Sequence, residues 1–224
     1  MPPTDTTRAP TRIDIEAIRS EALGCTKCAL SQGRTQVVWA DGNLDADLLF
    51  IGEAPGFHED KQGKPFVGAA GQLLDTVLGE IGYDRSRVAI VNVLKCRPPG
   101  NRDPQPREIE SCTPYLDAQL GHMKPKVIVT LGNFATKFIL DQPIGITRAR
   151  GQRYQRRGAV VVPTFHPAAA LRGGRFAGIS PIDAIRQDLQ VAKAALIEIE
   201  QEEARARAAT PVVALAEGEQ LGLF

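Results

Sequence analysis

The sequence predicts an α/β fold, with a central, mainly parallel four-stranded sheet between two helical layers in a three-layer α/β/α arrangement. Four short apolar runs alternate along the chain with segments of helical periodicity. The runs are continuously apolar rather than alternating, as in parallel strands that are covered on both faces. With 224 residues, the chain is long enough for one such domain with a sizeable core.

The predicted strands are the runs "DLLFIG", "VAIVNVLKC", "PKVIVTLG" and "AVVVPTFHP", at 47–52, 88–96, 125–132 and 159–167. A short helix is predicted from Ile13 to Leu23, and a second helical face runs through 69–82 and ends at Gly82. Further helices are expected within 103–123 and at 133–140. The last helix starts with Ser180 as N-cap and Pro181 at the first helical position, and it runs to about Ala208.

The composition is that of a globular protein whose overall charge is nearly balanced. The net charge is +1, so the charge total indicates neither a nucleic-acid nor a membrane partner. No apolar run approaches 18 residues, and the polar N-terminus lacks a signal-peptide core, so we expect a cytoplasmic protein without a membrane partner. We also expect the protein to be a monomer. Residues 1–12 are expected to be disordered, 13–208 to form the domain, and 209–224 to form a flexible tail.

Four cysteines indicate a metal or cluster site. Cys25 and Cys28 form a C-x2-C pair in "GCTKCAL", and Cys96 and Cys112 follow much later in the chain. Two residues between thiols let both sulfurs point at one centre, which favours binding over four unrelated core cysteines. Zinc and an iron–sulfur cluster both accept four thiolates, and the spacing does not choose between them.

Polar segments follow each of the four predicted strands. "GEAPG" follows the first strand, Asn92 lies near the end of the second, "LGN" follows the third and "FHP" the fourth. The carboxyl ends of parallel strands meet at one edge of a sheet, where ligands bind, so these segments are expected to converge on one pocket. No GK[ST] follows "GEAPG" and no G-x-G-x-x-G is present, so a nucleotide-phosphate cofactor loses its usual signal.

Three side chains of this pocket suit a flat heterocycle. Phe66, held in "GKPFVG", can stack on a ring, although an ordinary core Phe is the alternative. The amide of Asn92 can match the edge of a pyrimidine, or else bond to neighbouring loop backbone. Among the three histidines (58, 122 and 166), only His166 ends a predicted strand, where a structural role is the alternative.

A basic stretch brackets the fourth strand. Seven arginines and no acidic residue lie between Gly145 and Arg175, at 148, 150, 153, 156, 157, 172 and 175. Their position around the pocket favours contacts with a phosphate backbone over a merely solvated hairpin. "HPAAALRGGR" can insert Leu171 as a wedge between base pairs, and the whole set describes extrusion of a base into a pocket. The H-x-E…P-C-x-x-C pattern of a zinc deaminase is absent.

These motifs together resemble the family 4 uracil-DNA glycosylases, the iron–sulfur members of that superfamily. The resemblance rests on "GEAPG…EDKQGKPFVGAAGQLL", "NVLKCRPPGNR", "FHPAAALR" and the four cysteines, and it extends from about Leu23 to Leu196. It implies hydrolysis of the N-glycosidic bond of deoxyuridine in DNA, within base excision repair in the nucleoid. By resemblance, a [4Fe–4S] cluster is bound by Cys25, Cys28, Cys96 and Cys112, and uracil by Gly52, Glu53, Ala54, Phe66, Asn92 and His166.

The resemblance also suggests a mechanism. His166 is expected to donate to uracil O2 and to stabilise the charge on the departing base, and removing such a donor costs on the order of 10²–10³ in rate. Family 1 enzymes carry a water-positioning Asp where this chain has Ala54, so Glu53 is the nearest candidate to hold the water; hydrogen bonding to loop backbone is its alternative role. A related subgroup that binds uracil-DNA covalently has "GEQPG" and a basic insertion, which this chain lacks.

Two alternatives of another class remain: a non-turnover uracil-DNA sensor and a zinc-stapled nucleic-acid-binding module. DNA contacts are expected from Leu171, Arg172, Arg148, Arg150 and Arg153, on single- and double-stranded substrates. Because Ala170 is small, duplex opening is expected to be weak and single strands preferred.

The final "QLGLF" resembles the motif by which bacterial proteins bind the replication sliding clamp. The contacts would come from Gln220, Leu221, Leu223 and Phe224, and the alternative is a tail that folds back on its own domain.

Overall fold

A computed structural model describes residues 14–176 and 178–209 of the chain. Its single sheet has the strand order β1-β3-β2-β4-β6-β5. The strands are β1 (Asp41–Gly42), β2 (Leu48–Gly52), β3 (Ala89–Asn92), β4 (Val127–Leu131), β5 (Tyr154–Arg156) and β6 (Ala159–Thr164). The four central strands are parallel, and β1 and β5 run antiparallel at the two edges.

Eight α-helices are present in the described residues: α1 (Ile15–Leu23), α2 (Phe57–Gln62), α3 (Ala69–Glu80), α4 (Pro106–Met123), α5 (Asn133–Leu140), α6 (Ile146–Ala149), α7 (Pro167–Leu171) and α8 (Pro181–Ala209). Three short 3-10 turns join them: η1 (Ala29–Gln32), η2 (Arg85–Arg87) and η3 (Pro99–Asn101). None of the helices within the described ranges is long and apolar enough to cross a bilayer.

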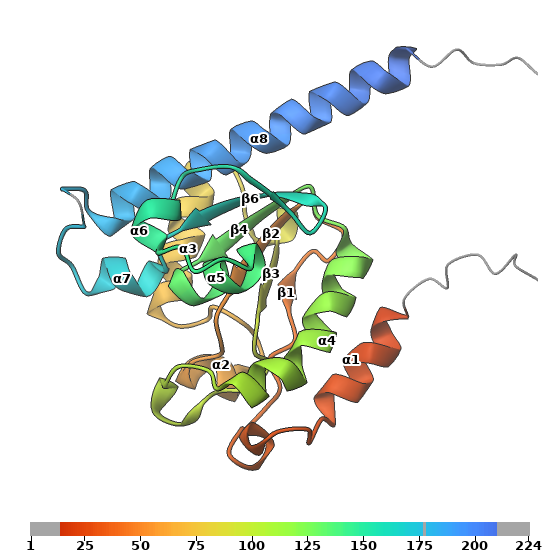
Figure 1. Cartoon of the computed structure of the whole chain (residues 1–224), viewed down its shortest axis with the longest axis vertical. Coiled ribbons are helices and arrows are strands. Elements are labelled where there is room, and N and C mark those ends of the chain that lie inside the picture. Colours follow the sequence, from red (N-terminus) through yellow and green to blue (C-terminus); the bar gives the residue numbers. More distant parts are fainter. Residues whose placement is uncertain (1–13, 177, 210–224) are drawn as a thin grey trace, which may run out of the picture.

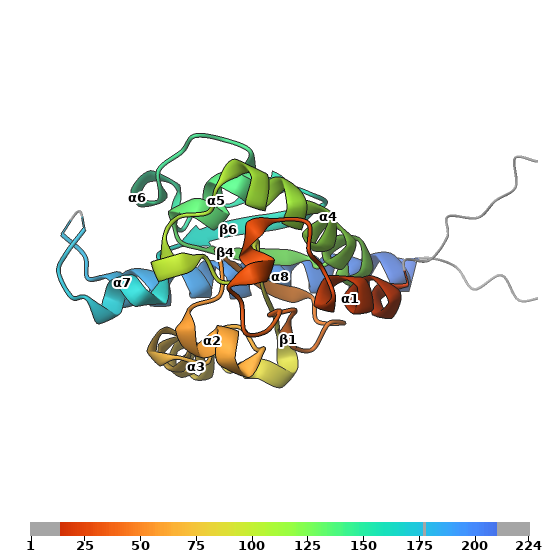
Figure 2. The ribbon, with the colours of Figure 1, turned by 90° about the horizontal axis from the view of Figure 1, so that it is seen from below.

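The sheet separates two apolar cores. Alternate strand residues such as Phe50, Ile90 and Val129 pack with α3 and α8 on one face. Their neighbours, such as Ile51 and Ile128, pack with α4 and α5 on the other face. Figures 1 and 2 show the sheet between these layers, with the long α8 lying across one side. The alternation explains the continuously apolar strands, because both faces of each strand are buried.

The α/β class, the layered arrangement and the four parallel strands are confirmed, but the predicted strand count was wrong. The sheet has six strands, because β1 and β5 extend it at its edges. Both are short and polar: β1 comprises two residues and β5 three, with exposed or half-exposed side chains. Edge strands of this kind need no apolar pattern, since one side of each faces solvent.

The predicted helices are found with small shifts in their ends. The helix at 133–140 has the expected bounds, and α8 begins at Pro181 with the Ser180 side chain accepting a hydrogen bond from Asp183 N. The short helices α2, α6 and α7 lack enough residues for a periodic signal. The expectations for residues 1–12 and for the tail from 210 onward fall outside the described residues.

Candidate active site

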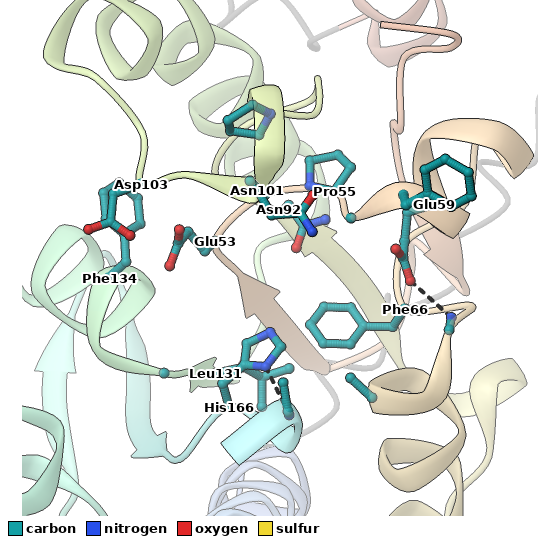
Figure 3. A pocket seen from close by; sticks show the side chains of 18 of the residues that line it. Glu53, Pro55, Glu59, Phe66, Asn92, Asn101, Asp103, Leu131, Phe134 and His166 are labelled. Atoms are coloured by element: carbon teal, nitrogen blue, oxygen red, sulfur yellow. Dashed lines mark hydrogen bonds between the residues drawn. The ribbon is translucent and has the colours of Figure 1, made fainter. Parts of the chain in front are cut away.

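A cavity of about 820 Å³ lies at the carboxyl ends of the four parallel strands. Its walls come from the loops after β2, β3, β4 and β6, which are far apart in the sequence. Glu53, Ala54, Phe66, Asn92 and His166 all line it, and Figure 3 shows four of them around the same space. The structure therefore brings these five candidates together, as the parallel sheet required.

Gly52 is the last residue of β2 and lies behind the cavity rather than in its lining. A Cβ at this position would stand 2.3 Å from Asn92 Oδ1 and 2.7 Å from the Phe66 ring. Only a residue without a side chain allows both groups to approach the strand end. The role of Gly52 in the structure is therefore to make room for Phe66 and Asn92.

The Phe66 loop is held from several directions. The Phe66 backbone has a φ of 54°, which is uncommon for a residue with a side chain. Arg85 donates to the carbonyl oxygens of Pro65 and Phe66, and Glu59 Oε1 accepts from Val67 N at 3.0 Å and from Gly68 N at 2.9 Å. These contacts fix an otherwise strained loop, so its ring is positioned before any ligand arrives.

The ring of Phe66 faces that of His166. Their centroids are 5.5 Å apart and their planes differ by 28°. Figure 3 shows both rings projecting into the cavity, with the Asn92 side chain beyond them. An aromatic plane, an imidazole and an amide thus border one space.

Asn92 ends β3 and is buried, with 2% of its surface exposed. Its backbone carbonyl accepts a hydrogen bond from Lys95 Nζ at 2.6 Å. Its side-chain oxygen, by contrast, has no hydrogen-bond partner in the described part of the chain. A buried, unpaired amide oxygen is costly, so it favours a ligand-binding role over the alternative of pairing with the loop backbone.

Lys95 is a residue that the sequence reasoning missed. Its fully buried ammonium also donates to Gln119 Oε1 at 2.5 Å, and Gln119 Nε2 donates to Trp39 O at 3.0 Å. The ammonium lies 5.7 Å from the centroid of the Trp39 ring. A lysine within the apolar run "VAIVNVLKC" was the available signal, because a buried charge requires partners.

His166 is the N-cap of α7, and its tautomer follows from its hydrogen bond. Nδ1 accepts from Ala168 N at 3.1 Å, which leaves the proton of the neutral ring on Nε2. Burial, assisted by the nearby charge of Arg172, lowers the pKa of His166 to about 4. Gly132 leaves room for His166, since a Cβ there would lie 3.0 Å from His166 Cβ. The imidazole is therefore a neutral N–H donor at physiological pH.

Glu53 follows β2 directly and lines the cavity. Burial raises the pKa of Glu53 above its ordinary value, and the charge of Asp103 raises it further. Both carboxylates line the cavity and lie on the same side of it in Figure 3. Ala54, the adjacent lining residue, adds no polar group.

The arginines of the basic stretch divide into two groups. Arg150 is turned inward, where Asp188 of α8 accepts from its Nε at 3.0 Å and from its Nη2 at 2.8 Å. Arg153 pairs with Glu198 on the surface of the same helix. The expectation that Arg150 contacts phosphate is not supported, because the buried Asp188 already binds its guanidinium. Arg148 and Arg172 are exposed, and Arg172 lines the cavity.

Leu171 closes α7 beside the cavity. Its side chain is 53% exposed, which is high for a large apolar residue. Ala170, in contrast, packs against the core on the α3 and α8 side. Leu171 is thus the apolar side chain that α7 presents to solvent, as expected of a wedge.

The four cysteines come from three separate segments and are all free thiols. Cys96 and Cys112 are buried in an apolar cluster that Cys28 joins, while Cys25 packs beside Trp39 and Tyr115. Burial raises the pKa of the Cys112 thiol, and the proximity of Cys28 and Cys25 raises it further. Burial likewise raises the pKa of Cys96 to about 11, against the nearby Arg34, whose Nη1 lies 3.5 Å from the Cys96 sulfur.

These thiols form a common neighbourhood but not a tight single-ion site. Among the described residues, no three or more His, Cys, Asp or Glu side chains are arranged to hold one metal ion. The donor set of four thiols in an apolar setting fits the chemistry of an iron–sulfur cluster, in which different irons bind the different thiolates. Arg34 supplies a positive charge beside them, donating also to Cys25 O at 2.6 Å.

Known proteins to which this chain is similar include several uracil-DNA glycosylases. The model of the uracil DNA glycosylase superfamily matches residues 39–190. A type-4 uracil-DNA glycosylase of Sulfurisphaera tokodaii is 49% identical over 166 residues, which cover 70% of this chain and 76% of the relative. A type-4 uracil-DNA glycosylase of Thermotoga maritima is 47% identical, with 72% and 86% covered.

A more distant relative is the type-5 uracil-DNA glycosylase of Pyrobaculum aerophilum, 31% identical over 61% of this chain and 66% of that protein. The type-4 enzyme of Archaeoglobus fulgidus is 46% identical, with 70% of this chain and 83% of the relative covered. With the family model spanning the sheet and the cavity, the chain belongs to the uracil-DNA glycosylase superfamily and, within it, to the type-4 group.

Proposed function

We propose that this protein excises uracil from DNA by hydrolysing its N-glycosidic bond, which leaves an abasic site for base excision repair. The observation that carries the proposal is the buried, unpaired Oδ1 of Asn92 in a cavity bordered by Phe66 and a neutral His166. A pyrimidine with adjacent C=O and N–H groups completes the hydrogen bonds that Asn92 lacks.

Uracil enters the cavity after its nucleotide is rotated out of the strand. Its ring stacks on Phe66, whose loop is held by Arg85 and Glu59. Asn92 reads N3–H and O4: its Oδ1 accepts from N3–H and its amide N–H donates to O4. Cytosine presents an acceptor at N3 and a donor at N4, so it leaves both groups of Asn92 mismatched and is rejected.

Bond cleavage depends on the departing base. As the bond from C1′ to N1 breaks, negative charge accumulates on uracil and positive charge on the sugar. The Nε2–H of His166 donates to O2 and stabilises the anion, in an enclosed site where such a donor acts strongly. Because the imidazole is already neutral and fixed by Ala168 N, it needs no reorganisation during the reaction.

Glu53 is assigned the role of positioning the water that attacks C1′. Glu53 lines the cavity directly beside Ala54 in the chain. Of the two other acids in the lining, Glu59 already accepts hydrogen bonds from Val67 N and Gly68 N, and Asp103 lies before α4. Its charged form can orient a water and stabilise the positive sugar. A role in bonding the loop backbone is the competing assignment, and the pH dependence described in the Discussion distinguishes the two.

The four cysteines are proposed to hold a [4Fe–4S] cluster. The hydrolysis needs no electron transfer, so the cluster supplies structural cohesion: it joins the segment after α1, which carries Cys25 and Cys28, to the segment after β3 and to α4. The positive charge of Arg34 beside Cys96 supports a bound anionic centre, and the burial of Cys96 and Cys112 would keep that centre away from water.

The DNA-binding surface is proposed to include Arg148, Arg172 and Leu171. The two arginines are exposed and face phosphates, while Leu171 fills the gap that the rotated nucleotide leaves. Arg153 can take part only by giving up Glu198. Both single- and double-stranded DNA of the nucleoid are proposed substrates.

The C-terminal Gln220, Leu221, Leu223 and Phe224 are proposed to bind a sliding clamp. They lie outside the described residues, so the proposal rests on the sequence motif alone. Deletion of 220–224 tests it: clamp binding should disappear while base release from short oligonucleotides persists. Loss of base release instead would mean that the tail serves its own domain.

The central experiment measures free base released from an oligonucleotide that contains one uracil. The wild type should release uracil and leave an alkali-labile site, and an oligonucleotide with cytosine at that position should stay intact. Asn92→Asp should gain release of cytosine, because a protonated aspartic acid presents a donor and an acceptor in the order that cytosine requires. No release of uracil by the wild type would overturn the proposed function.

A further inference from the structure

Phe57 is an exposed aromatic residue on the wall of the cavity. It is the first residue of α2, and 47% of its surface is exposed. The described residues expose five large apolar side chains, Leu23, Phe57, Leu171, Phe176 and Ile197, and of these only Phe57 lines the cavity. Among the described residues it belongs to none of the apolar clusters, and its ring meets that of His58 edge-on, with the centroids 5.4 Å apart.

Two cations accompany this ring. Lys61 Nζ lies 4.7 Å from the ring centroid, and the guanidinium carbon of Arg97 lies 5.2 Å from it. Arg97 Nε donates to Asn101 Oδ1 at 2.7 Å, and Asn101 also lines the cavity. Lys61 is exposed, and so can move aside or toward a neighbouring anion. Both cations lie over the ring itself. When Lys61 turns to a phosphate, the ring offers a face on which a base can stack, and aromatic stacking combined with backbone-binding cations is how proteins bind single-stranded nucleic acid.

The nucleotides beside an extruded uracil need such a surface. When one nucleotide rotates into the cavity of a single strand, its neighbours lose a stacking partner and have no complementary strand to hold them. We propose that Phe57 is a stacking platform for the nucleobase adjacent to the extruded uracil in single-stranded DNA, with Lys61 and Arg97 binding the phosphates on either side of it. The inference rests on the proposed function, and names a second base-binding position for the same site.

Phe57 and Leu171 then have different tasks. The cavity lies between the α2 segment with Phe57 and the α7 segment with Leu171 and Arg172. In a duplex, the neighbouring base remains paired and stacked within the helix, and the gap is filled by Leu171. The contribution of Phe57 is therefore confined to single strands, where the neighbouring base is free to leave the stack.

The test combines a protein change with a substrate change. Binding is measured by fluorescence anisotropy for wild type, Phe57→Ala and Phe57→Trp, on a single-stranded oligonucleotide with one uracil and on its duplex. A second set of single strands carries a base-free sugar at the position before or after uracil. Ile197→Ala, which also removes an exposed apolar side chain but lies on α8 outside the cavity lining, is the control.

Phe57→Ala should weaken single-strand binding about 5- to 100-fold, the range for loss of one base–aromatic stack, and Phe57→Trp should restore it. One base-free neighbour should weaken wild-type binding by a similar factor and have little further effect on Phe57→Ala, since both changes remove the same contact. Duplex binding, and every measurement on Ile197→Ala, should stay near the wild-type values.

Two results would overturn the inference. One is single-strand affinity that Phe57→Ala leaves unchanged. The other is a base-free neighbour that weakens wild type and Phe57→Ala equally, which would place that base elsewhere. Failure of the proposed function is a separate result, because it would appear as no uracil release by the wild type itself.

Discussion

The cavity and the cysteine region differ in the surroundings of their polar atoms. The cysteine region is defined here by Cys25, Cys28, Cys96 and Cys112. In the cavity, the buried Oδ1 of Asn92 has no partner in the described structure, and Glu53 keeps a raised pKa without a cationic partner. In the cysteine region, thiols are enclosed by apolar side chains and approached by Arg34. The first arrangement suits a ligand that enters and leaves, and the second suits a centre that stays bound.

The two regions are nevertheless adjacent in the chain. Asn92 ends β3, and Cys96 follows four positions later, with Lys95 between them. Lys95 donates to the Asn92 carbonyl, and the Cys112 thiol accepts a hydrogen bond from the Lys95 backbone. A short, buried segment therefore joins Asn92, the residue proposed to read uracil, to Cys96, a proposed cluster ligand. The following predictions separate the two regions.

The largest effect is expected from breaking the cysteine region. Cys112→Ala should remove the visible absorption of the cluster and its iron content, and should lower the thermal midpoint by roughly 10 °C or more, as expected for loss of a bound centre. Absorption spectra, metal analysis and thermal unfolding measure this. Stoichiometric zinc in the wild type, or full iron content in the variant, would contradict the cluster assignment.

A mainly catalytic effect, with a smaller loss of stability, is expected in the cavity. His166→Ala should lower the single-turnover rate of uracil release by about 10²–10³, because it removes one preorganised donor to the departing base. Its iron content should stay at the wild-type level, and its thermal midpoint should fall by only a few degrees through loss of the α7 cap, which separates it from Cys112→Ala. His122→Ala, on α4 and outside the cavity lining, is the matched control and should keep full activity. Unchanged activity of His166→Ala would remove His166 from the mechanism.

The smallest effect concerns pH and tests Glu53. Burial raises the pKa of Glu53, so its carboxylate gains a proton as the pH falls through that raised value, and the rate should then drop about tenfold per pH unit. The pKa of His166 is lowered to about 4, so its imidazole stays neutral while Glu53 titrates and adds no second titration to the rate profile. Glu53→Gln should be slower and should lack this acid limb. An identical acid limb in Glu53→Gln would favour the loop-bonding role for Glu53.

Much of the cavity was predictable because parallel strands end at one edge. Glu53, Asn92 and His166 each follow or end an apolar run, so their convergence needs no knowledge of the loops. The strands β1 and β5 were not predictable, since two or three polar residues at an edge carry no pattern. Phe66 was placed correctly in the cavity, although its positive φ has no signature in "GKPFVG".

Long-range partners explain the other differences. The stretch 145–175 contains no acidic residue, so Arg150 looked free for phosphate, but Asp188 reaches it from α8, 38 residues away in sequence. Lys95 likewise depends on Gln119, which α4 supplies. Such pairs are decided by how helices pack on the sheet, and a local pattern cannot reveal which charge will be neutralised.

The position of Trp39 has an optical consequence. The chain contains one tryptophan, and its indole is buried, lies edge-on to Tyr115 at 6.4 Å and carries the Lys95 ammonium over its ring. Through Tyr115 it also adjoins the Cys25 segment. Selective excitation of Trp39 therefore reports on one position between the cavity and the cysteine region. The fluorescence of Trp39 should be quenched while the proposed iron–sulfur cluster is bound nearby and should increase as the cluster is lost. The time course of cluster binding can therefore be followed without a label.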